Sequence, residues 1–373
     1  MIDSIPSRLL AQGRAHSEFP AYNVRNDNGT WTPTNFGTYS REVQEACRAL
    51  IALGFKPGDT TAILGFNRPE WVIFDIATMM AGGAPAGIYT TCSPAEVQYI
   101  VSHSEAEIVL LEDLSQWQKI QAERANLPAL RHVVMMKGVP PIDDELVMSW
   151  EAFLANAGQT DESVIDERLD GLKEEQIATF IYTSGTTGPP KAVMLSHKNV
   201  TWTANIAAEI ATMGSDDSSL SYLPLSHIAE QMFSIHAPIT VGSAIYFAQS
   251  IDKVPDNLKE VQPTVLFGVP RIWEKMHAKV SAKMAEATGT KAKIVSWSMG
   301  VGKESSDLRN RGEAPGLLFT LKHKIAHRLL FSKIKPLMGL GNARMCVTGA
   351  APIAPEILEW FAGLDITIHE VYG

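Results

Sequence analysis

Helices and strands alternate in the hydrophobic pattern of the first part of the chain. Apolar residues recur at helical spacing from Val43 to Leu53, and Gly54 follows the last of them, so we expect a helix that ends there. Pro69 opens a second helix, and Ser93–Glu96 is a capping box that starts a third. Short apolar runs predict strands at residues 61–64, 87–90, 107–111 and 132–136. This alternation predicts a parallel sheet covered by helices on both faces.

The alternation returns in the second half, after a stretch without a clear period. Residues 138–173 contain prolines and acidic residues, and we interpret them as a linker. Further strands are expected at residues 177–182, 192–195, 244–247, 264–267, 344–347 and 366–368, and residues 271–340 are mostly helical in pattern. We therefore expect two α/β lobes, the first at residues 1–173 with its linker and the second at residues 174–373.

One helical stretch of the second half is basic and amphipathic. It carries the cations Lys322, Lys324, Arg328, Lys333 and Lys335 among the apolar residues Leu321, Ile325, Leu329, Leu330 and Phe331. Such a stretch can touch an anionic membrane surface as a peripheral contact. It can also be the solvated face of a helix that packs on the core, and we prefer this second interpretation.

Composition sets the broad class of the protein. The chain has 373 residues, of which 45% are hydrophobic and 20% charged, as is typical of a globular protein large enough for two lobes. Its net charge of −9 argues against a nucleic-acid partner. Cys47, Cys92 and Cys346 form no CxxC pair, so we expect neither a disulfide framework nor a zinc site. We find no signal peptide and no membrane-spanning apolar run, and we expect a cytoplasmic protein.

A loop rich in glycine and hydroxyl groups joins two of the predicted strands. It consists of Thr183, Ser184, Gly185, Thr186, Thr187, Gly188, Pro189, Pro190 and Lys191. Glycines let backbone N–H groups approach an anion, hydroxyls donate hydrogen bonds, and a lysine adds positive charge. The loop is therefore a candidate phosphate cradle, although a plain polar hairpin loop has a similar composition. It is not a Walker A motif, because Pro190 precedes Lys191 and Ala192 follows it.

The segment Tyr182–Val193 resembles the phosphate loop of the adenylate-forming superfamily, which includes acyl-CoA synthetases, luciferases and adenylation domains. The resemblance implies that Thr183–Gly188 and Lys191 bind the phosphates of ATP, that Thr183 contacts Mg²⁺, and that Lys191 acts in catalysis. It also implies the large N-terminal domain of that fold, with two sheet-and-helix lobes packed as a layered αβαβα sandwich. The family usually has Gly at the position of Ala192, where Ala would be strained only at a positive φ.

Two more segments match motifs of the superfamily around the acyl group. The run Leu-Pro-Leu-Ser-His ends at His227; a lone histidine is usually structural, but the resemblance implies that His227 lies beside the acyl carboxylate and acts in catalysis. Members that act on long acids have a bulky gate residue a few positions later, near Gln231. Residues 267–275 resemble the segment that long-chain acyl-CoA synthetases place along the fatty-acid tunnel. Gly268 and Arg271 are therefore expected to contact substrate, although a strand–turn–helix junction has the same pattern.

Two motifs near the C-terminal end are expected to bind adenine. Gly349, Ala350 and Ala351 form a small-residue turn after a predicted strand, which permits close approach of a flat group. Tyr372 and Gly373 match the start of the family's Tyr-Gly-x-Thr-Glu motif, whose tyrosine stacks on adenine. The resemblance thus assigns all five residues to the nucleotide, although a tyrosine at a strand end is otherwise usually part of the core.

Residues 87–101, 268–276 and 296–302 are similar to the bubblegum-type branch of long-chain fatty acyl-CoA synthetases. That branch implies a two-step reaction, in which a fatty carboxylate attacks the α-phosphate of ATP and the thiol of CoA then displaces AMP. The implied ligands are a fatty acid, ATP, Mg²⁺ and CoA. Two alternatives stay open. The protein can act on another carboxylic acid or a carrier-protein acceptor, or it can bind nucleotide or acyl ligands without turnover.

The sequence stops within the Tyr-Gly-x-Thr-Glu motif. The family's Mg²⁺-binding Glu, its ribose-binding Asp and its small C-terminal domain with a catalytic lysine have no counterpart in these 373 residues. We therefore expect a truncated chain that has little or no activity by itself, because phosphoryl chemistry relies on positioned charge.

Overall fold

The computed structural model describes residues 1–183 and 188–372, and the chain divides into two compact units. Unit 1 comprises Met1–Asp216 and Ser221–Ser250, and unit 2 comprises Asp217–Leu220 and the chain from Ile251 onward. This division differs from the boundary expected at residue 173. The reason is that β8 (Ile177–Thr183) pairs in parallel with β4 (Ala84–Ile88), so the strand before the candidate phosphate loop continues the first sheet.

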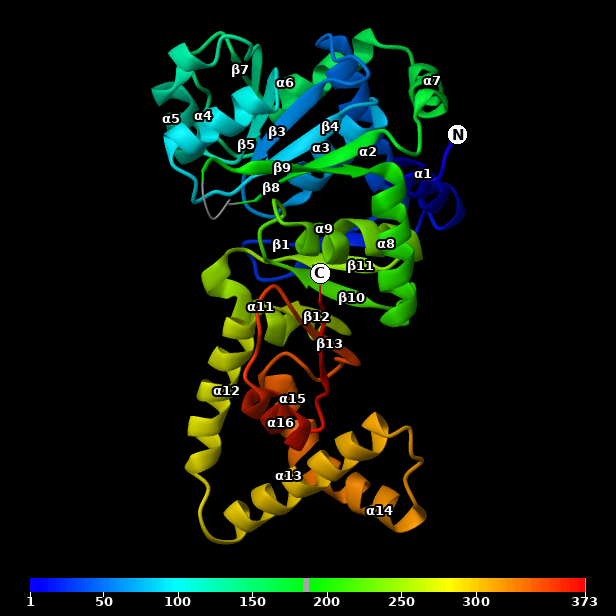
Figure 1. Ribbon diagram of the computed structural model, residues 1–373, viewed down its shortest axis with the longest axis vertical. Helices are drawn as coiled ribbons and strands as arrows, with labels where there is room; N and C mark the ends of the chain where they lie inside the picture. Colours follow the sequence, from blue (N-terminus) through cyan, green and yellow to red (C-terminus); the bar gives the residue numbers. More distant parts are fainter. Residues whose placement is uncertain (184–187, 373) are drawn as a thin grey trace. The chain divides into compact units, whose positions relative to one another are not determined.

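A seven-stranded sheet forms the centre of unit 1, with the order β7-β6-β5-β3-β4-β8-β9 (Figure 1). Its other strands are β3 (Thr60–Leu64), β5 (Ile108–Leu111), β6 (His132–Met135), β7 (Val147–Ser149) and β9 (Lys191–Ser196). Neighbouring strands pair in parallel from β7 to β8, and β9 joins as an antiparallel edge. The α/β class and the parallel sheet expected from the alternating pattern are confirmed.

Helices cover both faces of this sheet. The main ones are α2 (Phe36–Ala52), α3 (Pro69–Met80), α4 (Pro94–His103), α5 (Leu114–Ala122) and the short η1 (Arg124–Asn126). Successive side chains of a strand point to opposite faces. Accordingly, Ile63 packs in one core cluster with Trp71 of α3, and Leu64 packs in another with Val97 of α4. The predicted capping box is also confirmed, because Ser93 and Glu96 bond reciprocally at the start of α4.

Residues 138–173 are not the linker that the sequence suggested. They contain β7, α6 (Trp150–Ala155), η2 (Asn156–Gln159) and α7 (Val164–Gly171). Trp150 and Phe153 are fully buried in the core of unit 1. None of these short elements buries more than two large apolar side chains, which is too few to produce a visible period.

A smaller sheet completes unit 1, in which β1 (Pro20–Arg25) pairs in parallel with β11 (Ala244–Phe247) and antiparallel with β2 (Trp31–Asn35). The helices of this part are α1 (Ile5–Ala15), α8 (His197–Ile210), α9 (Ile228–Gln231), the π-helical η3 (Met232–His236) and α10 (Ala237–Val241). Ser196 caps α8, as predicted. Along the sequence, β10 (Ser218–Ser221) falls where the chain passes from one unit to the other.

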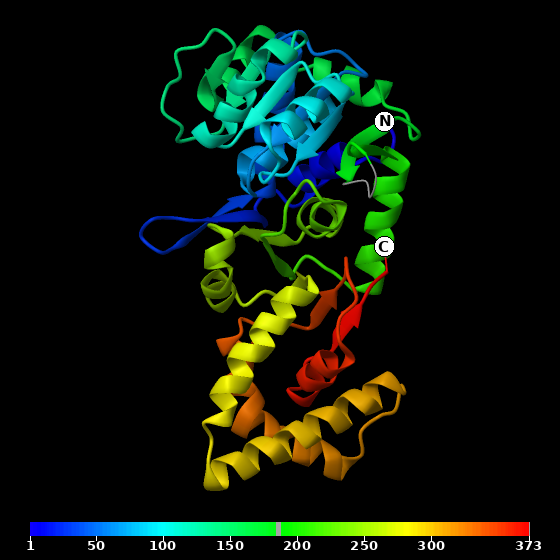
Figure 2. The ribbon, with the colours of Figure 1, turned by 60° about the vertical axis from the view of Figure 1, so that its left-hand side comes forward.

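Unit 2 is built on a three-stranded parallel sheet (Figure 2). Its strands are β12 (Val265–Gly268), β13 (Met345–Thr348) and β14 (Ile368–Glu370), in that order. Its helices are η4 (Ile251–Lys253), α11 (Val254–Val261), α12 (Pro270–Ala285), α13 (Gly289–Asn310), α14 (Leu317–Ala326), the π-helical η5 (His327–Phe331), α15 (Ser332–Leu337) and α16 (Pro355–Gly363). The strands lie within two residues of their predicted positions, and the helical character of residues 271–340 is confirmed.

Within the described ranges, no helix is both long and apolar enough to cross a membrane. The same residues contain no group of three or more His, Cys, Asp or Glu side chains that could hold a metal ion.

Candidate functional site

The two ends of the candidate phosphate loop lie at the carboxyl edge of the large sheet of unit 1. Thr183 is the last residue of β8 and Lys191 is the first of β9, and the two are paired directly across the hairpin. Ligands of open parallel sheets bind outside the carboxyl ends of the strands, so the loop has the position of a ligand site. Both side chains are exposed, and neither has a hydrogen bond or ion pair with any described residue.

The backbone around the loop explains two of its residues. Gly188 has a φ of 111°, a conformation that side-chain-bearing residues rarely adopt. Ala192 lies in β9 opposite Tyr182 and is absent from the described residues with positive φ, so Ala is unstrained where the family has Gly. Ser184, Gly185, Thr186 and Thr187 lie outside the described residues.

His227 caps the short helix α9. Its Nδ1 accepts a hydrogen bond from the backbone N–H of Ala229 at 3.1 Å, and burial lowers the pKa of the imidazole below its ordinary value. An accepting Nδ1 carries no proton, so the neutral ring keeps its proton on Nε2. Half-buried His227 therefore offers one N–H donor to a ligand in unit 1.

Gln231, at the expected gate position, is fully buried. Its Nε2 donates to the carbonyl of Leu225 at 3.0 Å, which ties the helix to the segment before His227. This contact gives Gln231 a structural role, and its role as a gate stays a prediction.

A buried carboxylate next to this segment was not predicted from the sequence. Glu230 Oε1 accepts hydrogen bonds from Ser221 Oγ at 2.9 Å, Ser234 Oγ at 2.7 Å, the backbone N–H of Tyr222 at 3.0 Å and Asn67 Nδ2 at 3.2 Å. Burial raises the pKa of Glu230 to about 7, although these hydrogen bonds oppose the rise. The network holds both sides of the Leu-Pro-Leu-Ser-His run and so positions His227.

Unit 2 brings several predicted residues together at the carboxyl edge of its own sheet. Gly268 ends β12 and pairs with Thr348 at the end of β13, directly before Gly349. A Cβ on Gly268 would lie 2.9 Å from Nε1 of Trp273, whose N–H donates to the carbonyl of Gly268 at 3.0 Å. Gly268 is thus required by packing. Arg271 is exposed in the first turn of α12.

The predicted adenine turn has an unusual backbone. Ala350 adopts a φ of 68°, in the left-handed region, and both Ala350 and Ala351 are exposed. A Cβ on Gly349 would lie 3.0 Å from Cγ2 of Val371, so a larger residue there would have to displace the Val371 side chain. Strain of this kind in an exposed turn is frequent at ligand sites. Tyr372 exposes its whole side chain and is therefore not a core residue; Gly373 lies outside the described residues.

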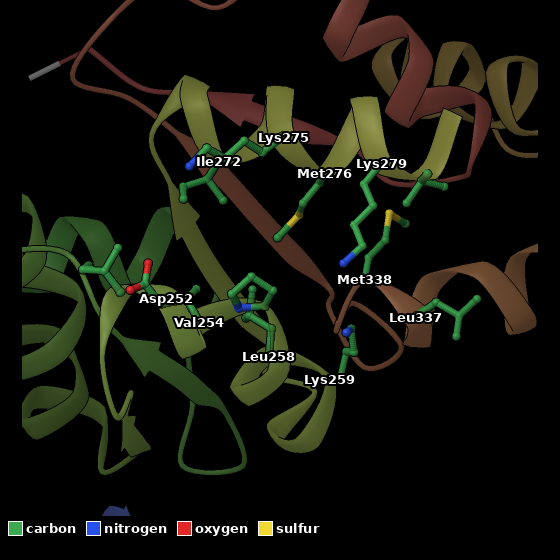
Figure 3. Close-up of a pocket in the computed structure, with 13 residues that line it drawn as sticks. Asp252, Val254, Leu258, Lys259, Ile272, Lys275, Met276, Lys279, Leu337 and Met338 are labelled. Atoms are coloured by element: carbon green, nitrogen blue, oxygen red, sulfur yellow. The ribbon is translucent and has the colours of Figure 1, made fainter. Parts of the chain in front are cut away.

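A cavity of about 340 Å³ lies beside the segment expected to follow the acyl chain (Figure 3). Its floor is formed by Val254, Leu258 and Met338, which are buried, and Ile272 and Met276 of α12 line its wall. Lys275 and Lys279 lie at its rim, whereas Gly268 and Arg271 are not among its lining residues. The cavity combines an apolar interior with cationic edges.

Solved structures share this fold. The N-terminal domain of FACL13 from Mycobacterium tuberculosis matches 100% of this chain and 76% of its own, with a TM-score of 0.71 and 18% identity. The adenylation domain of a carboxylate reductase from Mycobacterium chelonae matches 99% of this chain and 57% of its own, with a TM-score of 0.72 and 16% identity. The chain thus has the fold of the large N-terminal domain of adenylate-forming enzymes.

The chain belongs to the AMP-binding enzyme family, which it matches over residues 9–373. It is 38% identical over 355 residues to the long-chain-fatty-acid–CoA ligase ACSBG2 of Xenopus laevis, covering 92% of this chain and 47% of the relative. Human ACSBG2 is 36% identical over 99% of this chain and 56% of its own, and human ACSBG1 is 33% identical over 92% and 48%. The resemblance stated from the sequence motifs is confirmed, and the chain spans about half the length of these relatives.

Proposed function

We propose that this chain is part of an enzyme that activates a long-chain fatty acid with ATP and transfers the acyl group to CoA. The family, and the long-chain-fatty-acid–CoA ligase activity for which the ACSBG relatives are named, support this proposal. In the first step the carboxylate attacks the α-phosphate, which releases pyrophosphate and forms acyl-AMP. In the second step the thiol of CoA attacks the acyl carbon and releases AMP.

One observation carries the proposal, namely the pairing of Thr183 with Lys191 across the mouth of the loop. It places a hydroxyl and a cation together at the carboxyl edge of the sheet, with no protein partner among the described residues. A lysine in this position would bind the β- and γ-phosphates and offset negative charge on the departing pyrophosphate.

The resemblance implies Mg²⁺ at this site. The ion prefers oxygen ligands and is usually held by one or two carboxylates together with substrate phosphates. Thr183 would supply its hydroxyl oxygen, and the ion would neutralise phosphate charge when bound.

In unit 1, His227 would donate its Nε2–H to the fatty carboxylate and so orient it. In unit 2, the turn Gly349–Ala351 would lie against adenine and Tyr372 would stack on it. Gly268 and Arg271 would border the acyl group. We expect none of these residues to form a covalent intermediate, because the carboxylate itself is the nucleophile.

The test is exchange of labelled pyrophosphate into ATP by the complete protein that contains this chain, with and without a carboxylic acid. We expect exchange with palmitate and other long-chain fatty acids and little with benzoate or amino acids, followed by acyl-CoA formation when CoA is added. Exchange that is driven best by an aryl or amino acid would assign a different substrate class. ATP binding without any acid-dependent exchange would contradict the proposal.

A further inference from the structure

The outer face of α14 is apolar and turned to solvent. Leu317, Leu321 and Ile325 recur every four residues along it, and their side chains are 92%, 58% and 45% exposed. Leu318 is 81% exposed, and Leu329 in η5 continues the row. Side chains four apart share one helix face, so these residues form a continuous apolar stripe, which we call the α14 stripe. Exposed apolar patches of this kind mark interaction surfaces.

The opposite face fixes the orientation of the helix. Ala326, Leu330 and Phe331 are buried in unit 2, and His323 Nε2 lies 3.2 Å from Asp365 Oδ2. Asp365 also pairs with Lys335 and Arg309 at 3.1 and 2.8 Å. Because this inner face is anchored, the stripe cannot turn inward without breaking these contacts. The helix thus packs on the core with one face, as the interpretation preferred from the sequence has it, and its solvated face carries leucines as well as cations.

The surroundings of the stripe are strongly basic. From residue 314 to residue 355 the sequence contains no Asp or Glu, although the whole chain has a net charge of −9. Lys322, Lys324, Arg328 and Lys333 are exposed in this region. Among the described residues, none of these four side chains has an ion-pair or hydrogen-bond partner. An apolar stripe flanked by free cations matches a surface that is apolar inside and anionic outside.

We propose that α14 docks in the plane of an anionic lipid surface, with the α14 stripe in the boundary between headgroups and acyl chains and the cations on the headgroups. Amphipathic helices with these two components bind anionic membranes without crossing them. A second copy of the chain is a poorer occupant. A symmetric contact through this helix would bring its cations against their own copies, which is repulsive.

The experiment is flotation of the complete protein with vesicles, in the absence of ATP and CoA so that the result does not depend on turnover. The vesicles are phosphatidylcholine alone or phosphatidylcholine mixed with phosphatidylglycerol. We expect binding only to the mixed vesicles, weakened by salt. Leu317→Ser with Leu321→Ser should reduce it at least about 10-fold, because burial of each leucine is lost. The control is Trp202→Ser with Ile210→Ser, which removes similarly exposed apolar side chains from unit 1 and should leave flotation unchanged.

Charge is tested separately with Lys322→Glu and Lys324→Glu, which should also reduce binding about 10-fold or more. Lys56→Glu with Lys173→Glu makes the same change in net charge at exposed positions of unit 1 and should have little effect. Absence of flotation with the mixed vesicles, or equal losses in the test and control variants, would overturn the proposal. A dimer in solution that dissociates on Leu317→Ser would also overturn it, because the stripe would then be a contact between copies.

Discussion

Two alanines at motif positions differ in backbone conformation, and this difference decides how much strain each adds to the folded state. Ala350 has a φ of 68°, whereas Ala192 lies in β9 and is absent from the described residues with positive φ. A residue with a Cβ in the left-handed region is strained by about 1 kcal/mol, and glycine is not.

We therefore expect Ala350→Gly to raise the free energy of unfolding by up to about 1 kcal/mol, because relief of strain exceeds the added flexibility of the unfolded chain. Ala192→Gly is the matched control and should lower it by about 0.5–1 kcal/mol, since it only adds flexibility to a strand. Denaturant unfolding of both variants measures this. Destabilisation of equal size in both would contradict the left-handed conformation of Ala350.

Glu230 gives a pH-dependent prediction. Its pKa is raised from 4.5 to about 7 by burial, so the folded state holds the proton more tightly than the unfolded state does. Such a group contributes its full stability below pH 4.5 and loses it as the pH rises to about 7, a change of about 3 kcal/mol. Glu230→Gln keeps an acceptor oxygen and removes the charge, so its stability relative to the parent should increase across this window. Urea unfolding from pH 4.5 to 8 tests this, and a constant difference would contradict it.

At the scale of elements, the contact between α13 and α16 depends on a glycine. A Cβ on Gly302 would lie 2.2 Å from the carbonyl oxygen of Gly363, a backbone atom that cannot rotate away. Gly300 on the same helix has no atom within 4 Å of such a Cβ. We expect Gly302→Ala to destabilise unit 2 by about 1–3 kcal/mol. Gly300→Ala should be neutral or stabilise it by up to about 1 kcal/mol. Thermal unfolding compares the two, and similar effects would mean that the helices do not approach this closely.

Elements with a long period or a strong local signal could be predicted from the sequence, and others could not. The cap of α4 needs only Ser93 and Glu96, which are three residues apart, so the sequence shows it directly. The short elements between residues 138 and 173 depend on the burial of Trp150 and Phe153 in the core, which the local sequence pattern does not show. For α14, helical spacing predicted the helix but could not say which of its two apolar faces would be buried.

At the scale of the whole molecule, the sequence likewise predicts contacts between nearby residues of the candidate site but not contacts between distant ones. The loop between the two predicted strands is too short for a parallel crossover, which favours a hairpin that brings Thr183 and Lys191 together. The Glu230 network could not be foreseen, because Asn67 lies 163 residues away from its partner. The predicted residues also divide between the units, with Lys191 and His227 in unit 1 and Gly349 and Tyr372 in unit 2.

Lys191 allows the proposed phosphate site to be tested in the complete protein. It is proposed to bind only the phosphates that AMP lacks, and a charged hydrogen bond is worth about 1.5–3 kcal/mol. Lys191→Ala should therefore weaken ATP binding roughly 10- to 100-fold and leave AMP binding unchanged.

Gly349→Val, which would place side-chain atoms against Val371 and displace the turn, should weaken the binding of both ligands alike because both contain adenine. Lys198→Ala removes an exposed lysine that pairs with Glu175 on the surface, and it should affect neither ligand. Titration calorimetry with ATP and with AMP resolves the two patterns. An equal loss of both ligands on Lys191→Ala would mean that the loop supports the nucleotide site only through folding, and that the phosphates are bound elsewhere.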